Sequence, residues 1–447
     1  ATAIAALVGT AYAIQGVAPP QVRSGLGVLA FVLVACLFSK NLRAVNWRTV
    51  GAGVLLQFVL AVLILRVPLV FDFFRAIGDA IQKFIDFTNE GAAFVFGPLL
   101  NDAAVERGLG LGQGQGFIFV VKALPAVIFV SSFFTVLYHL GVLQFVVKLF
   151  ARAMVWVMGT SGAETLSATA NVFMGQTEAP LIVRPYIAKM TRSELLTLMI
   201  GGMATISGGV MVAYVGMLNK IGMSDQAVAI LATSVMAAPC GLYVAKILLP
   251  ETDVPATHGS VKVDVPSTHA NVFDAAADGA SEGMKLVINI AAMLIAFIAF
   301  VALFNHLLLK LDTRLGVQQS LGLGAPLSLQ LVFSWVFAPV ALLMGVPAAD
   351  VPAVGELLGT KLVLNEFVAY LVMSEKYAGQ LAPRSVALTA FALTGFANFA
   401  SVGIQLGGIG AMAPERRADL ARLGLLALAG GFLATLINAA VAGILMG

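Results

Sequence analysis

Long apolar runs dominate the chain, and polar residues are mostly confined to the segments between them. A helix that spans a bilayer needs about 20 mainly apolar residues. Eight runs meet this requirement and predict transmembrane helices at 24–39, 49–66, 116–147, 194–218, 226–249, 284–309, 386–410 and 420–446. Residues 2–18 are also apolar but short, so they predict either a peripheral helix or a ninth span.

A different pattern follows the second run. Over residues 68–90, phenylalanine and isoleucine recur at helical spacing, while aspartate, arginine and lysine occupy the opposite face. This pattern is typical of an amphipathic helix in the membrane interface, although a loop helix packed on the protein fits it equally well. The long polar connection at 250–282 predicts a solvent-exposed loop.

Two further segments, residues 160–190 and 328–373, are moderately apolar but carry polar residues in their middle. Each is about as long as two half-helices, and each predicts a re-entrant hairpin that enters the membrane and leaves on the same side. Non-helical backbone at membrane depth is tolerated only inside protein or beside a cavity. Both hairpins are therefore expected at the centre of the molecule.

The second half of the chain repeats the order of features found in the first half. In each half an apolar run precedes a hairpin with one key glutamate, Glu178 or Glu366, and an Arg-Ser pair follows the hairpin. A polar interruption then divides the next apolar run, and one more run closes the unit. Because each unit holds three spans, the second unit should be inverted relative to the first, as in many secondary transporters.

Basic residues predict the orientation in the membrane. They gather between the first two spans and between the last two spans, at Lys40, Arg43, Arg48, Arg416, Arg417 and Arg422. Cytoplasmic loops carry an excess of lysine and arginine, so both loops are assigned to the cytoplasm and both termini to the outside. Basic residues at 310–314 and 376–384 lie on the predicted outside and weaken this bias.

The composition supports a membrane protein and argues against several other classes. Apolar residues form 60% of the 447 residues and charged residues 11%, against about 25% charged in a soluble domain. The mean hydropathy is +0.96. The net charge of +3 makes no basic patch for a nucleic acid. Two cysteines and four histidines show neither a disulfide framework nor a zinc spacing.

The first hairpin concentrates polar groups in an apolar segment. Asn171, Gln176, Thr177 and Glu178 lie within eight residues. An ionised carboxylate near the membrane midplane is costly unless it is paired or hydrated, and a helix break there exposes backbone groups to a ligand. These residues therefore predict a binding site. The structural alternative is a local ion pair between Glu178 and Arg184.

Two later segments carry similar chemistry. Glu366 lies in the second hairpin, where an ion pair with Lys361 is the structural alternative. Asn398 and Ser401 are three residues apart and share a helix face, and Phe396 adds an aromatic ring nearby. The alternative for Asn398 and Ser401 is that they hold membrane helices together by hydrogen bonds.

Together these segments offer amides, hydroxyls, carboxylates and aromatic rings without a cationic cluster. This set suits a neutral, polyhydroxylated ligand with a planar polar ring, because a carboxylate accepts hydrogen bonds from vicinal hydroxyls and an amide matches the edge of a base. The interruption at 204–209 can present carbonyl oxygens to a cation, beside the hydroxyls of Thr205 and Ser207 and the amide oxygen of Asn171. Oxygen ligands of this kind suit Na⁺, and a titrating glutamate leaves protons as the alternative coupling ion.

In these segments the chain resembles the concentrative nucleoside transporter family. The resemblance rests on GQTEAPLIVRPY at 175–186, MATISGG at 203–209, NEFVAY at 365–370 and GFANFAS at 395–401. It implies an all-α integral membrane protein with eight transmembrane helices, two re-entrant hairpins, an interfacial helix and an inverted internal repeat, assembled as a homotrimer. It also implies a secondary transporter that imports nucleosides with Na⁺ by an elevator-type movement.

The resemblance implies eight substrate-binding residues: Gln176, Thr177, Glu178, Val210, Glu366, Phe396, Asn398 and Ser401. The first three would contact the nucleobase, directly or through water, and Val210 would line the base pocket. Glu366 and Asn398 would bind ribose hydroxyls, with Ser401 nearby and Phe396 packed on the ligand.

The resemblance also implies a sodium site. Its ligands would be the side chain of Asn171, the carbonyl of Met174, the side chain and carbonyl of Thr205, and the carbonyl of Ile206. Thr205 stands where a serine is expected in sodium-coupled bacterial members, and the hydroxyl is retained. No other cofactor is expected.

The predicted organisation combines the spans, the repeat and the resemblance. It comprises an N-terminal extension of unknown role at 1–22, a scaffold part at 23–115, a first repeat at 116–249, the loop at 250–282 and a second repeat at 283–447. By resemblance the first, second and sixth spans and the interfacial helix form the scaffold and make the trimer contacts, while the part with the hairpins moves.

The expected partners are a nucleoside such as uridine or adenosine, Na⁺ and the lipid bilayer, and the expected location is the bacterial inner membrane. A proton-coupled transporter of nucleosides or of another neutral polar solute is an alternative. A membrane-embedded hydrolase that uses Glu178 and Glu366 as acid and base is another, but no nucleophile–base constellation supports an enzyme. A preference between purine and pyrimidine does not follow from the sequence.

Overall fold

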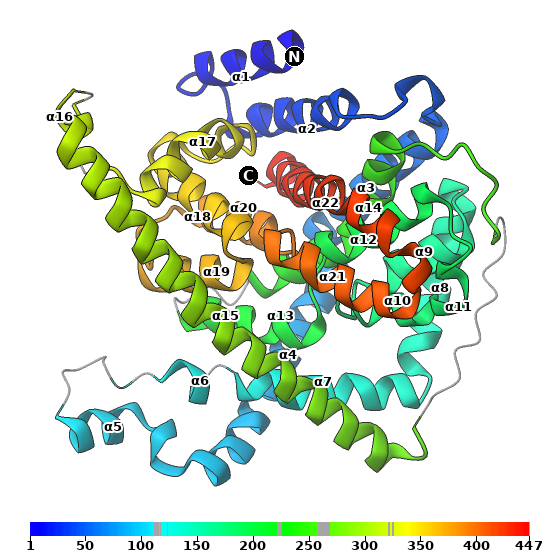
Figure 1. Cartoon of the computed structure of the whole chain (residues 1–447), viewed down its shortest axis with the longest axis horizontal. Helices are drawn as coiled ribbons and strands as arrows, with labels where there is room; N and C mark the ends of the chain where they lie inside the picture. The colour runs from blue at the N-terminus through cyan, green and yellow to red at the C-terminus, as the bar shows by residue number, and fades with distance from the viewer. Residues whose placement is uncertain are drawn as a thin grey trace.

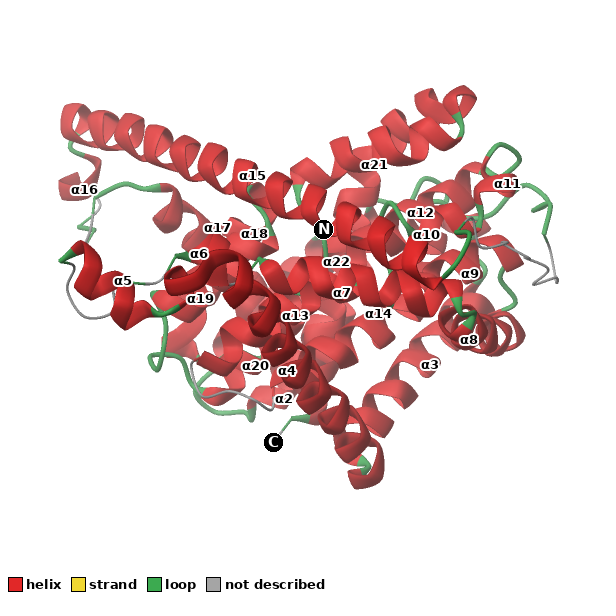
Figure 2. Ribbon diagram, turned by 90° about the horizontal axis from the view of Figure 1, so that it is seen from below, coloured by secondary structure: helices red, strands yellow, loops and turns green. Residues whose placement is uncertain are grey.

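The computed structural model describes residues 1–110, 116, 118–122, 124–220, 226–257, 269–320, 322–323 and 326–446. Throughout these residues the chain is helical and no strand is present. Residues 258–268 of the predicted polar loop lie outside the described part. Figures 1 and 2 show the helices packed into one body, with some helices in the middle and others around them.

The helices run in chain order as α1 (Thr2–Ala13), α2 (Pro20–Leu37), α3 (Trp47–Arg66), α4 (Pro68–Phe96), α5 (Asp102–Leu109), α6 (Phe119–Lys122), α7 (Pro125–His139), α8 (Val142–Met158), α9 (Gly162–Ala170), α10 (Ala179–Ile182), α11 (Arg184–Ile187), α12 (Arg192–Ala204), α13 (Gly208–Lys220), α14 (Gln226–Leu248), α15 (Val272–Leu315), α16 (Val317–Ser320), α17 (Leu329–Leu343), α18 (Val351–Val363), α19 (Glu366–Glu375), α20 (Pro383–Leu393), α21 (Phe399–Met412) and α22 (Arg417–Leu445).

Seven segments of the described chain are long and apolar enough to cross a membrane: Pro20–Leu37, Trp47–Arg66, Val120–His139, Arg192–Leu218, Ala227–Leu248, Val272–Leu315 and Pro414–Leu445. They correspond to seven of the eight predicted spans. The remaining prediction, 386–410, falls on two shorter helices, α20 and α21, which are separated by residues 394–398. The predicted polar interruption at this place is therefore confirmed.

Two predicted spans differ from the structure in length. The run at 116–147 is divided, because α7 ends at His139 and Gly141, with φ +79°, turns the chain into α8. In contrast, α15 is 44 residues long and begins at Val272, inside the segment predicted as a loop. The side chain of Asn271 accepts a hydrogen bond from the Asp274 N–H at 3.0 Å and so caps this start.

The amphipathic segment forms the predicted helix, α4, which continues to Phe96. Its Phe84 ring packs on Phe129 and Phe133 of α7, with ring centroids 5.5 and 4.6 Å apart. The position of α4 in the membrane interface stays a prediction. The N-terminal helix α1 has 12 residues, and at 1.5 Å per residue it reaches about 18 Å, which is too short to cross a bilayer core of about 30 Å.

The centre of the molecule is formed by α12, α13, α14 and α22. The apolar windows of their spans are 83–100% buried, whereas that of α15 is 12% buried. In Figure 1, α15 runs diagonally across the view from α16 to the lower right, and within the chain it packs mainly on α7. An apolar helix with so little cover within its own chain must be covered by lipid or by another chain.

The first predicted hairpin is formed by α9, a tip at 171–178, and the short helices α10 and α11. Its base is fastened by buried polar groups. The Ser161 hydroxyl donates to Glu194 of α12, and the Lys246 ammonium of α14 lies 2.7 Å from the Glu164 carboxylate. Because both charges are buried, each needs the other as a partner.

The second predicted hairpin is shorter than the sequence indicated. Residues 328–373 hold three helices, so the chain turns twice, at residues 344–350 between α17 and α18 and at Leu364–Asn365 between α18 and α19. An ion pair connects the two helices on either side of the turn at Leu364–Asn365. In it the Lys376 ammonium lies 2.7 Å from the Glu356 carboxylate of α18. The first helix of this segment, α17, packs along α18 as an additional helix. The prediction of two half-helices over the whole segment is therefore wrong in extent.

The two helix interruptions lie against each other at the centre. The first separates α12 from α13, and the second separates α20 from α21. The Phe396 N–H donates to the Thr205 carbonyl across them, with an N–O distance of 3.1 Å. Gly395 has φ +132°, and a Cβ there would lie 3.0 Å from the carbonyl oxygens of both Met203 and Ala204. Only glycine fits this close approach.

We therefore expect Gly395→Ala to lower the free energy of unfolding by about 1–3 kcal/mol, since the side chain forces a strained backbone against α12. Thermal unfolding of the purified protein in one detergent measures the loss. Gly403→Ala is the matched control, because Gly403 lies within α21 with open space around its Cβ position. Equal unfolding temperatures for the two variants would contradict the tight contact.

Candidate functional site

A buried chain of polar side chains connects the second hairpin to the first. Glu366 is the first residue of α19 and is 4% exposed. Its carboxylate accepts hydrogen bonds from the Tyr214 hydroxyl at 2.9 Å and from the Asn398 amide at 3.0 Å. Both donors are neutral, so the carboxylate has a charge and further lone pairs for a ligand.

The local sequence fixes the position of Glu366. Asn365 caps α19 by accepting a hydrogen bond from the Val368 N–H at 2.8 Å. Tyr214 of α13 stacks on Tyr370 of α19, with ring centroids 4.4 Å apart, and this holds its hydroxyl toward Glu366. The predicted alternative was a local ion pair with Lys361. In the structure Lys361 donates instead to the Ala392 carbonyl and the Thr435 hydroxyl.

The start of α21 continues the polar chain. Asn398 caps this helix by accepting a hydrogen bond from the Ser401 N–H at 2.9 Å, while its amide nitrogen reaches Glu366. The Ser401 hydroxyl accepts a hydrogen bond from the Gln176 amide, in the tip of the first hairpin, at 3.2 Å. The structural role expected of Asn398 and Ser401 is thus present, and the same two residues join both hairpins.

Gln405 is a member of this cluster that the sequence reasoning missed. Its amide nitrogen donates to the Gln176 side-chain oxygen at 3.2 Å and to the Met199 carbonyl at 3.0 Å. Gln405 is 0% exposed, and its side-chain oxygen has no partner among the described residues. A lone glutamine in an apolar run, four residues after Ser401 and so on the same helix face, was the available signal.

The other four substrate residues lie on the elements that carry this chain. The Glu178 carboxylate accepts from the Gly175 N–H at 3.0 Å, at the tip of the first hairpin. The Thr177 methyl group lies 2.8 Å from the Cβ position of Gly408 and so packs on α21. Val210 is buried one turn before Tyr214, and Phe396 is partly buried within the second interruption.

Glu178 and Arg184 are both described, and the structure shows no ion pair between them, so the predicted local pair is not present. The side chains of Thr177, Glu178, Val210 and Phe396 make no hydrogen bond to the Gln176–Glu366 chain within the described residues. The structure therefore brings Gln176, Glu366, Asn398 and Ser401 into direct contact and places the remaining four on the same elements.

Buried oxygen atoms also gather where the first hairpin meets α12. The Asn171 amide nitrogen donates to the Ser167 carbonyl at 3.0 Å, but the amide oxygen is buried and has no partner in the described chain. A Cβ at Gly201 would lie 3.2 Å from this amide, so Asn171 packs on the last turn of α12. That turn ends at Thr205, whose hydroxyl donates to the Gly201 carbonyl and keeps lone pairs to offer.

An unpartnered buried carbonyl oxygen costs about 1–3 kcal/mol, so the Asn171 amide oxygen is well suited to contact a ligand. Met174 lies three residues after Asn171 in the same tip, and Ile206 follows Thr205 in the interruption, fully buried. The predicted set offers amide, hydroxyl and carbonyl oxygens and no charged group. Neutral oxygen donors at an unwound helix fit a sodium ion.

Interrupted helices that meet hairpins around a buried polar site, within an apolar helical bundle, define the class of secondary transporters. Comparison with known families narrows this class. A model described as "Na+ dependent nucleoside transporter C-terminus" matches residues 229–443, and the corresponding N-terminus model matches residues 26–99. A model described as "Nucleoside recognition" matches residues 120–221.

Individual proteins agree with the family models. An uncharacterized transporter of Haemophilus influenzae is 42% identical over 428 residues, which cover 94% of this chain and 97% of that protein. Human sodium/nucleoside cotransporter 1 is 40% identical over 442 residues, which cover 96% of this chain and 64% of that protein. The chain thus spans less than two thirds of the length of this mammalian relative.

Solved structures match over nearly the whole chain. CNTnw in an inward-facing substrate-bound state gives a TM-score of 0.84 at 38% identity and covers 95% of this chain and 97% of that chain. A CNTnw variant in an outward-facing state gives a TM-score of 0.85 at the same identity and the same coverage. The chain therefore belongs to the concentrative, Na⁺-dependent family of nucleoside transporters, which confirms the predicted family and the helical membrane fold.

Proposed function

We propose that this chain imports nucleosides together with Na⁺ across the bacterial inner membrane. The observation that carries the proposal is the Glu366 carboxylate, which is buried and, within the described residues, accepts side-chain hydrogen bonds from the neutral Tyr214 hydroxyl and Asn398 amide. Such a group binds two vicinal hydroxyls well. Relatives named as sodium/nucleoside cotransporters support the substrate and the ion.

The two ends of the polar chain suit the two parts of a nucleoside. Glu366 and Asn398 would take the ribose hydroxyls, and Gln176, with its amide held between Ser401 and Gln405, would take the edge of the base. Thr177, Glu178, Val210 and Phe396 would complete the pocket around the base and the sugar. An anionic substrate would be repelled by the carboxylates of Glu178 and Glu366.

We place the sodium ion between Asn171, Met174, Thr205 and Ile206. Binding there would fasten the tip of the first hairpin to the end of α12. The same Thr205 supplies its carbonyl to the Phe396 N–H, so the ion site and the substrate site share one residue. A structural element that two sites share can couple their two ligands.

Transport would follow alternating access, with the hairpins and interrupted helices moving as one unit past a scaffold. CNTnw in inward-facing, outward-facing and intermediate states supports this elevator-type movement. The homotrimer proposed for the scaffold rests on the family resemblance. A proton-coupled transporter of nucleosides or another neutral solute is the alternative, because carboxylates in the site can also bind protons.

Uridine binding to the purified protein by calorimetry, in Na⁺ and in K⁺ at equal ionic strength, tests the proposal. We expect tight binding only in Na⁺. Thr205→Val should raise the apparent Na⁺ dissociation constant at least about tenfold, because it removes an oxygen that contacts a charge. Thr197→Val is the control, since its buried hydroxyl also bonds only within α12.

Each outcome has a distinct meaning. Equal uridine affinity in Na⁺ and K⁺ would remove sodium coupling and keep the nucleoside site. If neither uridine nor adenosine bound in either salt, the substrate assignment itself would be overturned. If Thr197→Val shifted the Na⁺ dependence as much as Thr205→Val, the ion would lie elsewhere.

Replacing the Glu366 carboxylate by an amide tests whether Glu366 binds the ribose. We expect Glu366→Gln to weaken uridine binding at least about 100-fold, because an amide accepts hydrogen bonds from a diol far less strongly than a carboxylate does. Glu375→Gln, an exposed position at the end of the same helix, should leave the affinity unchanged. Unchanged affinity in the Glu366 variant would exclude it from ribose binding.

Gln405→Met keeps the shape of the buried side chain and removes its hydrogen bond to Gln176. The freed amide should reorient, so uridine affinity should fall about two- to tenfold and the ratio of uridine to adenosine affinity should change. Gln144→Met, on α8, is the control. A lower unfolding temperature with an unchanged affinity ratio would give Gln405 a purely structural role.

A further inference from the structure

A cavity lies far from the candidate transport site, where four apolar helices end together. Its volume is about 760 Å³, and it is lined by Phe38, Lys40, Arg192, Leu249, Arg422, Leu423, Leu425, Leu426 and Ala429. Arg192 begins α12, whereas Thr205 ends it. At 1.5 Å per residue, the cavity and the candidate sodium site are about 20 Å apart along this helix.

The position of the cavity matches the surface of a bilayer. Lys40 follows the end of α2, Leu249 follows the end of α14, and Arg422 lies in the second turn of α22. Each of these helices belongs to a segment long and apolar enough to cross a membrane. Ends of spanning helices lie at the level of the lipid headgroups.

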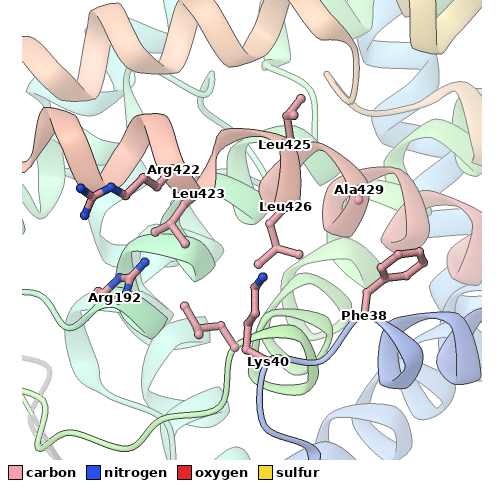
Figure 3. A pocket seen from close by; sticks show the side chains of 9 residues that line it. Phe38, Lys40, Arg192, Arg422, Leu423, Leu425, Leu426 and Ala429 are labelled. Atoms are coloured by element: carbon pink, nitrogen blue, oxygen red, sulfur yellow. The ribbon is translucent and has the colours of Figure 1, made fainter.

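Three cationic side chains are among the residues that line the cavity, and none of the lining residues is acidic. In Figure 3, Lys40, Arg192 and Arg422 come from three separate elements, and the Arg422 side chain extends away from Lys40. Lys40 and Arg422 make no ion pair within the described residues, and Arg192 lies 3.8 Å from Asp419, outside the lining. The cavity therefore carries a positive charge that its own chain leaves mostly uncompensated.

The other walls are apolar and open outward. Leu425 is 68% exposed and Phe38 is 60% exposed, and Leu423 and Leu426 continue the apolar surface inward. In Figure 3 the Lys40 ammonium points along this leucine wall. A free inorganic anion would contact only the basic side chains. A molecule with an anionic head and hydrocarbon chains would also cover the leucines and the phenylalanine.

We propose that this cavity binds an anionic phospholipid, with its charged headgroup among Lys40, Arg192 and Arg422 and its acyl chains along Phe38 and Leu425. Basic pockets between spanning helices on the cytoplasmic side take such headgroups, and the basic residues of these loops predict that side here. Because the cavity joins the end of α2 to the starts of α12 and α22, a bound lipid ties these three elements together.

Native mass spectrometry of the full-length protein in detergent tests the proposal, with phosphatidylglycerol and phosphatidylcholine as probes. The protein should retain phosphatidylglycerol and release phosphatidylcholine. Each basic side chain near an anionic lipid contributes roughly fivefold in affinity, so Lys40→Gln with Arg422→Gln should weaken retention about 30-fold. Arg43→Gln with Arg48→Gln removes the same charge from the same side, outside the cavity, and should retain the lipid.

Thermal unfolding in nanodiscs shows whether each variant is folded and whether the lipid stabilises it. Phosphatidylglycerol should raise the unfolding temperature of the unmodified protein and of the Arg43/Arg48 variant, and not that of the Lys40/Arg422 variant. Equal retention of both lipids, or equal behaviour of the two double variants, would overturn the proposal. Displacement of the lipid by millimolar inorganic phosphate would assign the cations to a free anion and would overturn it as well.

Discussion

The arrangement of this protein depends on one constraint, the cost of leaving backbone polar groups without partners inside an apolar bundle. Two helices, α12 and α20, end in the centre of the molecule, where their last carbonyls and the next N–H groups have no helical partner. The structure satisfies them across elements: Phe396 N–H donates to Thr205, and Gly208 N–H donates to the Phe173 carbonyl. The interruptions and the first hairpin tip must therefore meet, which brings the polar side chains beside them together.

This convergence explains why the candidate sodium and nucleoside sites adjoin. Thr205 carries a hydroxyl next to Asn171 and a carbonyl bonded to Phe396, and Asn398, two residues later, caps α21 and reaches Glu366. If the proposed ion holds the first hairpin tip against Thr205, the same residue connects that tip to the start of α21 through Phe396. Cooperation between ion and substrate then needs no distant relay, because a few hydrogen bonds span the distance between them.

The sequence predicts the spans, both interruptions and most of the candidate site, because apolar length and isolated polar residues are strong signals in a membrane chain. It misjudges 328–373, because α17 has only 15 residues and is too short to stand out as a separate span, and it places residues 272–282 in a loop because their charges hide the start of α15. Gln405 and Tyr214 were missed for another reason. Each is a single polar group in an apolar helix, and only the packing of the two interruptions shows which neighbour it meets.

The partners of the buried charged side chains distinguish those with a structural role from the one that is a candidate for binding a ligand. At the base of the first hairpin, Lys246 lies 2.7 Å from Glu164. The two charges form an ion pair that holds the hairpin in place. Lys361 is equally buried and close in sequence to Glu366, yet its ammonium bonds to a carbonyl and a hydroxyl. If Lys361 were paired with Glu366, ribose hydroxyls would have to compete with an ion pair. Because the donors to Glu366 are neutral, a ligand can gain the stronger, charge-assisted hydrogen bonds, and this favours α19 as the helix that carries the proposed sugar site.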